Sequence, residues 1–96
     1  MQKVMAAAIG LGSIAAAVVA SAEPPAGAAA CSGCHPASTR VTSPVPRLAG
    51  LDAAAIVRAM QDFRSGTRAA TVMDRISKGF TDEEIQAIAA WYATQR

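Results

Sequence analysis

Two thiols and one imidazole fall within five consecutive residues, Cys31-Ser32-Gly33-Cys34-His35. Two cysteines three positions apart, followed directly by a histidine, form the attachment signature of a c-type haem. On one helical turn, side chains at positions i and i+3 point the same way, so both thiols can add to one edge of a porphyrin. His35 can then bind the iron through one ring nitrogen while the other donates to a fixed acceptor. It is the only histidine in the chain and therefore the only candidate for a proximal imidazole ligand.

The N-terminus has the organisation of a secretory signal peptide. Met1-Gln2-Lys3 is a short basic segment, residues 4–20 are an apolar run rich in alanine, and Ala20-Ser21-Ala22 is a small-residue cleavage site. The run is shorter than the roughly 20 apolar residues of a spanning helix. We therefore expect residues 1–22 to be a signal peptide and residues 23–96 to be one periplasmic domain. The alternative is that the segment is retained as an anchor.

Two other chemistries use closely spaced cysteines. A Cys-x-x-Cys pair can be a redox-active dithiol, which we would expect at the start of a helix that follows a strand, but no β-rich run precedes Cys31. A structural zinc site normally has four ligands, whereas this motif offers three. Because the five-residue pattern coincides with an export signal, one covalently bound haem c is the preferred interpretation.

Size and charge restrict the function further. A domain spanning residues 23–96 rarely buries enough apolar surface to be stable without a disulfide, a metal or another staple, and a covalently held porphyrin would supply one. The chain has nine basic and seven acidic residues, for a formal net charge of +2. This balance lacks the strong basic excess that is typical of nucleic-acid-binding proteins.

Hydrophobic periodicity predicts an all-α fold of about four short helices, because no segment alternates between polar and apolar residues with a period of two. We expect helices over residues 28–35, 51–65 and 74–78, and a final helix that begins with the sequence Thr81-Asp82-Glu83-Glu84. Asp52 is a plausible N-cap and Gly66 closes the second helix, while Thr81 and Glu84 form a capping box. The expected apolar stripes are Ile56, Met60 and Phe63 on the second helix, and Ile85, Ile88, Ala89 and Tyr92 on the last.

The composition of residues 36–47 predicts a loop directly after His35, because it contains Pro36, Pro44 and Pro46 among serines and threonines. Such a loop can wrap one edge of a porphyrin and hold a backbone carbonyl rigidly. Pro46 is the candidate for presenting an acceptor to the free ring nitrogen of His35. The alternative is a rigid turn without that contact.

A second axial ligand must come from far along the chain, because it approaches the iron from the opposite face of the porphyrin. A thioether sulfur is a soft ligand, and a Met/His pair raises the reduction potential into the range of cytochromes c. Met1 and Met5 belong to the expected signal peptide, which leaves Met60 and Met73. Met60 falls on an apolar stripe, so core packing is its expected role. Met73 directly follows the connector of residues 66–72 and lies outside the apolar stripes of the two main helices. It is the expected ligand, the alternative being a methionine that fills a gap in the core.

The chain resembles the class I cytochromes c, and more narrowly the monohaem cytochrome subunit of flavocytochrome c sulfide dehydrogenase and its diffusible bacterial relatives. The likeness covers nearly all of residues 28–94. It rests on Met73 and on the segments CSGCH, PRLAGLDAAAIVRAMQDFRSGTR and ISKGFTDEEIQAIAAWYA. One departure is the sequence Pro36-Ala37-Ser38-Thr39-Arg40, where the family often has a glycine and an acidic residue. The surface at the haem edge, and with it the choice of partner, is expected to differ accordingly.

The resemblance implies a small fold in which the first and last helices cross beside the haem. It implies covalent attachment at Cys31 and Cys34, axial ligation by His35 and Met73, and a Pro46 carbonyl behind His35. The implied function is one-electron transfer without bond-making chemistry, with a sulfide-oxidising flavoprotein as the electron donor. Candidates for the region of the haem propionates are Arg40, Arg47 and Arg68.

Three competing functions remain at this stage. The first is a free soluble carrier that serves a terminal oxidase. The second is a haem enzyme or gas sensor with an open sixth coordination site, although the sequence offers no second histidine and no evident distal acid-base pair. The third is a thiol-disulfide protein without haem, which the histidine directly after the cysteine pair disfavours.

Overall fold

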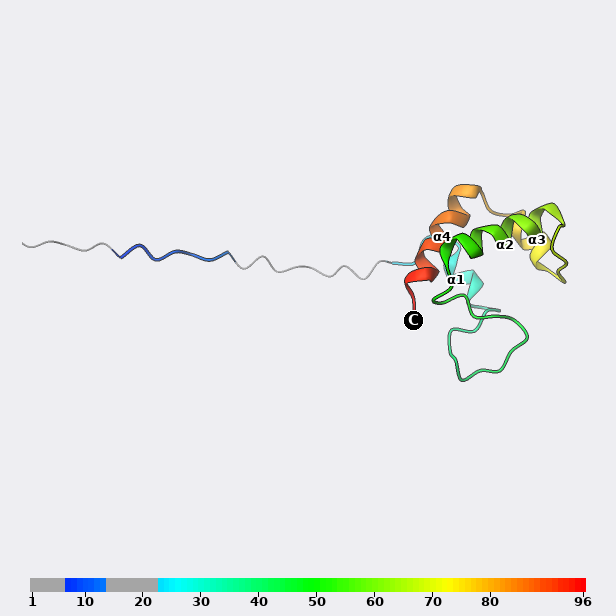
Figure 1. Cartoon of the computed structure of the whole chain (residues 1–96), viewed down its shortest axis with the longest axis horizontal. Helices are drawn as coiled ribbons and strands as arrows, with labels where there is room; N and C mark the ends of the chain where they lie inside the picture. The colour runs from blue at the N-terminus through cyan, green and yellow to red at the C-terminus, as the bar shows by residue number, and fades with distance from the viewer. Residues whose placement is uncertain (1–6, 14–22) are drawn as a thin grey trace, which may run out of the picture.

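The computed structural model describes residues 7–13 and 23–96. Most of the predicted signal peptide, residues 1–6 and 14–22, lies outside the described residues. The described residues form four helices and no strand, which confirms the predicted all-α class (Figure 1). The helices are α1 (Ala28–Cys31), α2 (Ala53–Ser65), α3 (Met73–Ser77) and α4 (Asp82–Thr94). None of the helices in this part of the chain is long and apolar enough to cross a membrane.

Helix α4 has the local signals that the sequence predicted. The Thr81 hydroxyl accepts a hydrogen bond from the Glu84 backbone N–H at 3.2 Å, and the Glu84 carboxylate accepts one from the Thr81 N–H at 3.4 Å. Three acidic residues in the first turn favour the positive end of the helix dipole. The predicted stripe of Ile85, Ile88, Ala89 and Tyr92 is buried.

Helix α2 begins two residues later than predicted, at Ala53, and ends at Ser65 as expected. Asp52 occupies the N-cap position, but its side chain makes no capping hydrogen bond. Gly66 closes the helix with a φ of 80°, a left-handed conformation that glycine adopts without a Cβ penalty. Of the predicted stripe, Ile56 is buried, whereas Met60 and Phe63 are half-buried.

The first helix is shorter than predicted, because α1 ends at Cys31 and not near His35. The backbone N–H groups of Cys34 and His35 both return to the Cys31 carbonyl oxygen, at 3.2 and 2.9 Å. Gly33 weakens helical structure, and a residue that precedes a proline, as His35 precedes Pro36, is biased away from helical dihedral angles. The motif therefore spans a helix end and the following turn.

Met73 is the first residue of α3, whereas the sequence placed it between the connector of residues 66–72 and a helical turn that begins at Asp74. It lies outside α2 and α4 as predicted, but on a regular element and not on a flexible segment. Helix α3 packs against α2, and α2 packs against α4. The buried cluster is small and consists of Ala28, Ile56, Ile88, Ala89 and Tyr92, with Leu48, Phe80 and Trp91 among the side chains packed around it.

Arg64 joins three of the four helices through its guanidinium group. Its Nη1 contacts the Asp82 carboxylate at 2.6 Å, while Nη2 donates to the Phe80 carbonyl at 2.6 Å and to the Ser77 carbonyl at 3.5 Å. Ser77, the last residue of α3, is fully buried. Arg64 therefore fastens the end of α3 and the start of α4 to the end of α2.

We expect the carbonyl contacts of Arg64 to stabilise the fold more than its ion pair with Asp82. Arg64→Met should lower the free energy of unfolding by about 2 kcal/mol, because two carbonyls lose a charged donor. Asp82→Asn should cost ~0.5 kcal/mol or less, because the carboxylate is 62% exposed and the pair is screened by solvent. Denaturant unfolding of the two variants checks this. Equal losses of unfolding free energy in the two variants would show that the ion pair with Asp82, and not the carbonyl contacts, stabilises the fold.

Candidate haem-attachment site

Helix α1 is held against α4 by a close backbone approach and one buried hydrogen bond. Gly27 precedes α1 with a φ of 87°, and a Cβ at this position would lie 2.6 Å from the ring of Phe80. The Tyr92 hydroxyl donates to the Ala28 carbonyl at 2.6 Å, and Ala28 has no exposed surface. The sequence before Cys31 is therefore placed by side chains more than fifty residues away.

The two cysteines differ in their surroundings. Cys31 is half-buried, and its Sγ lies 3.6 Å from the Gly27 carbonyl oxygen, to which the thiol donates. Burial raises the pKa of the Cys31 thiol. Cys34 is exposed, and no disulfide joins the pair. Both sulfurs are therefore free for the two thioether bonds that a c-type haem requires.

The His35 ring has a defined hydrogen-bond partner. Its Nδ1 lies 2.6 Å from the Pro46 carbonyl oxygen. A carbonyl can only accept, so the contact assigns the proton to Nδ1 and leaves Nε2 with a free lone pair. This is the tautomer that a metal-binding imidazole requires when its other nitrogen is held by a backbone carbonyl.

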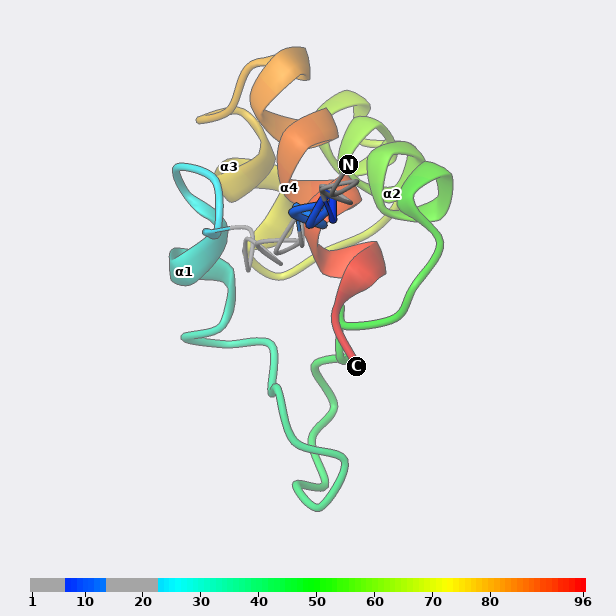
Figure 2. The same cartoon turned by 90° about the vertical axis from the view of Figure 1, so that its left-hand side faces the viewer.

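Met73 comes from a different part of the fold, at the start of α3, and is half-buried (Figure 2).

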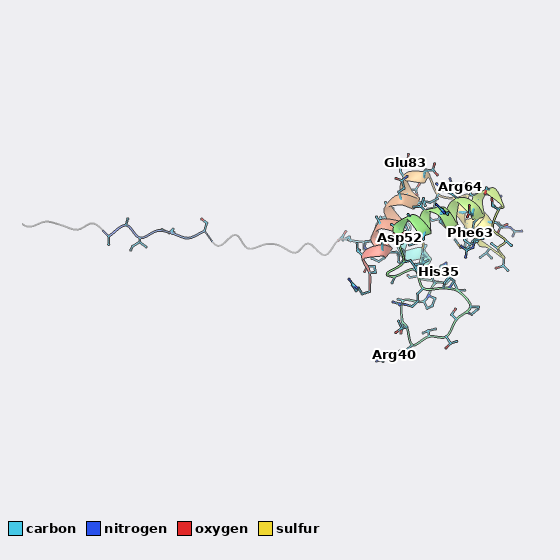
Figure 3. All side chains as sticks on the ribbon, viewed as in Figure 1. His35, Arg40, Asp52, Phe63, Arg64 and Glu83 are labelled. Atoms are coloured by element: carbon cyan, nitrogen blue, oxygen red, sulfur yellow. The ribbon has the colours of Figure 1, made fainter. Side chains whose placement is uncertain are left out.

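Two of the three candidate propionate arginines are already engaged with protein groups. Arg47 Nε donates to the Ala37 carbonyl at 2.9 Å, and the Arg68 guanidinium lies 4.9 Å from the centroid of the Phe63 ring. Arg40 is exposed and lies near the outer end of the 36–47 loop (Figure 3).

The residues present fit a covalently attached haem. Two free thiols, an imidazole with a free Nε2 and a thioether are the donor set that c-type haem uses. Two large apolar side chains close to Met73 in the sequence are only partly covered by protein, since Val72 and Ile76 are 51% and 41% exposed. These side chains suit an apolar macrocycle, which would also enlarge a small buried core.

Three contacts around the site were not anticipated from the sequence: Tyr92 to Ala28, Arg64 to the α3–α4 connection, and Arg47 to Ala37. Each joins a side chain to a backbone carbonyl at least ten residues away. Neither periodicity nor capping patterns indicate such pairs. The position of Arg47 directly after Pro46 was the one available hint for the last.

Comparison with known proteins found no matching family model. The chain is 40% identical over 62 residues to the cytochrome subunit of sulfide dehydrogenase of Chlorobaculum tepidum, covering 65% of this chain and 56% of that protein. It is 42% identical over 65 residues to a thiosulfate dehydrogenase electron acceptor of Stutzerimonas stutzeri, covering 66% and 30%. It is 34% identical over 65 residues to cytochrome c-552 of Acidithiobacillus ferridurans, covering 68% and 28%. The alignments thus span between 28% and 56% of these relatives.

The helical fold and the Cys-x-x-Cys-His motif define a small haem protein of the c type. The three similar proteins are named as a cytochrome subunit, an electron acceptor and a cytochrome c. The chain is similar in sequence to c-type cytochromes over about two thirds of its length, and its cofactor is a covalently bound haem c.

The contact between Tyr92 and Ala28 yields a prediction about stability. Tyr92→Phe should lower the free energy of unfolding by about 1–3 kcal/mol, because the buried Ala28 carbonyl loses its donor. Ser32→Ala is the control, since the Ser32 hydroxyl makes an exposed bond to the Ala29 carbonyl, and its loss should cost less than ~0.5 kcal/mol. Denaturant unfolding at neutral pH measures both.

Wild type and Tyr92→Phe should also differ in how their stability depends on pH. Burial raises the pKa of the Tyr92 phenol, so the folded state favours the protonated hydroxyl. The stabilisation by Tyr92 is then complete below the unfolded tyrosine pKa of about 10 and is lost as the pH rises through the raised value. Wild type and Tyr92→Phe should therefore converge in stability only at strongly alkaline pH. Convergence near neutral pH would contradict this.

Proposed function

We propose that the chain is an exported one-electron carrier whose haem c is attached through Cys31 and Cys34 and ligated by His35 and Met73. The observation that carries the proposal is the hydrogen bond from His35 Nδ1 to the Pro46 carbonyl, which leaves Nε2 free for a metal. When bound, the haem supplies a centre that alternates between the ferric and ferrous states. The protein binds and orients this group and makes no bond to a substrate.

Different residues of the chain have separate roles in binding and orienting the haem. The Pro46 carbonyl fixes the orientation of the His35 ring and increases the basicity of its Nε2. The Met73 thioether is a soft donor that favours the ferrous state. Tyr92 and Phe80 hold the start of α1 against α4, which keeps the attachment motif at a fixed place beside the apolar core.

The proposed electron donor is a flavoprotein that oxidises sulfide. This proposal is supported by the similarity to the sulfide dehydrogenase subunit of Chlorobaculum tepidum, which is named as a cytochrome. Redox encounters commonly use small, weak interfaces, so a chain of this size can serve as the acceptor. Mixing the ferric protein with such a flavoprotein and sulfide should reduce the haem far faster than sulfide alone. Equal rates would contradict the assignment of the donor.

The proposed location is the periplasm, supported by the signal-peptide pattern of residues 1–22 and by the need for an oxidising, haem-attaching compartment. The mature protein would then comprise residues 23–96 with one haem. Intact-mass measurement of the protein recovered from a bacterial periplasm tests both the cleavage site and the covalent attachment. A retained N-terminus would contradict the proposed cleavage.

The assignment of the second axial ligand can be tested with the two methionines of the domain. Met73→Ala should keep the haem covalently bound, abolish the weak ferric band that reports sulfur-to-iron ligation, lower the reduction potential and open the sixth site to added cyanide or imidazole. Met60→Ala is the matched control, because Met60 is half-buried on α2.

The control should lose about 1 kcal/mol of stability, because Met60 is only half-buried, and it should retain the sulfur band. The measurements are optical titration with exogenous ligand and equilibrium redox titration of the two holoproteins. A Met73→Ala protein with unchanged ligand affinity and potential would rule out ligation by Met73.

A further inference from the structure

The loop that follows the haem-attachment motif is closed at its neck by side chains. Residues 36–47 extend away from the helices in both views, as a wide arc in Figure 1 and as a narrower loop in Figure 2. Pro36 and Pro46 stand on the two arms of the neck, and proline has no backbone N–H to donate. A ladder of backbone hydrogen bonds therefore cannot form at these two positions.

Two hydrogen bonds cross the neck within the described residues. One runs from His35 Nδ1 to the Pro46 carbonyl at 2.6 Å, and the other runs from Arg47 Nε to the Ala37 carbonyl at 2.9 Å. The donors belong to opposite arms, so the two bonds form consecutive rungs. Farther out, the loop shows only local bonds, which the Arg40 N–H donates to the Ser38 hydroxyl oxygen and the Val45 N–H donates to the Ser43 hydroxyl oxygen.

We propose that Arg47 is a positioning residue that holds the Pro46 carbonyl against His35 Nδ1 and thereby tunes the reduction potential of the haem. The proposal rests on the ligation by His35 put forward above. Arg47 is bonded covalently to Pro46, so tying its side chain to Ala37 restrains the peptide that carries the acceptor. Apart from this bond, residues 38–45 of the described chain make no long-range hydrogen bond or ion pair that would keep the carbonyl in place.

The expected direction follows from the chemistry of the imidazole. A strong bond from Nδ1–H to a carbonyl increases the electron donation of Nε2 and favours ferric iron. If the Arg47 rung is lost, the carbonyl moves, the ligand becomes a weaker donor, and the ferrous fraction at a fixed potential rises. Removing a positive charge near the iron acts in the opposite direction, because it favours the more positive ferric state.

Because the two effects on the ferrous fraction have opposite signs, the direction of the shift distinguishes a positioning role of Arg47 from an effect of its charge. Arg47→Lys keeps the charge but places a methylene where Nε stood, and Arg47→Leu removes both the charge and the donor. Arg40→Gln is the matched control, because it removes a cation from the same loop at a site remote from His35 and without a long-range bond (Figure 3).

The experiment is a redox titration of the four holoproteins, wild type included. Arg47→Lys should raise the ferrous-to-ferric ratio at a fixed potential by up to about tenfold, which corresponds to ~59 mV for a one-electron couple. Arg47→Leu should raise this ratio less, because the loss of its charge acts in the opposite direction. Arg40→Gln should change the ratio less than about twofold, toward the ferric state. Exchange of the His35 Nδ1 proton with solvent, followed by NMR in the ferrous state, should be about tenfold faster in both Arg47 variants.

Unchanged potential and proton exchange in both Arg47 variants, in proteins that retain the His/Met spectrum, would overturn the inference and leave the proposed function intact. A shift toward the ferric state in Arg47→Leu, with no change in Arg47→Lys, would show that charge alone acts and would also overturn it. A wild-type protein without a His/Met spectrum would overturn the proposed function and this inference together.

Discussion

The hydrogen bond from His35 to the Pro46 carbonyl is the interaction on which the rest of the site depends. At 2.6 Å it fixes both the orientation of the ring and its tautomer, and it presents the nitrogen that a haem iron requires. It also ties the residue after the cysteine pair to the far arm of a proline-rich loop. A single contact therefore links the chemistry of the motif to the path of the chain around it.

Helices α1 and α3 carry the two ends of the site, and each of them is held in place by contacts with other parts of the fold. Helix α1 is anchored by the bond from Tyr92 to the Ala28 carbonyl and by the close approach of Gly27 and Phe80. Helix α3, which begins with Met73, is fastened to α2 and α4 through Arg64. Long side chains bonded to backbone carbonyls thus hold both α1 and α3 to the rest of the helices.

Local rules predicted the elements well and their contacts poorly. The capping box of Thr81 and the buried stripe of α4 follow from short-range spacing, and the structure has both. The attachment motif was expected on the last turns of a helix that ends near residues 33–36, yet α1 ends already at Cys31, ahead of Gly33 and Pro36. The bonds of Tyr92 and Arg47 join residues 64 and 10 positions apart, and no periodicity encodes such pairings. The placement of Met73 on a helix was missed because α3 is a short helix of only five residues.

The most direct test of the account is the optical spectrum of the wild-type holoprotein in the ferric and ferrous states. The account predicts a low-spin haem in both states, with the weak ferric band at the red edge that reports a bond between the Met73 sulfur and iron. A covalently bound haem with a high-spin ferric spectrum and no such band would contradict it. That result would indicate an open sixth coordination site and favour a haem enzyme or gas sensor.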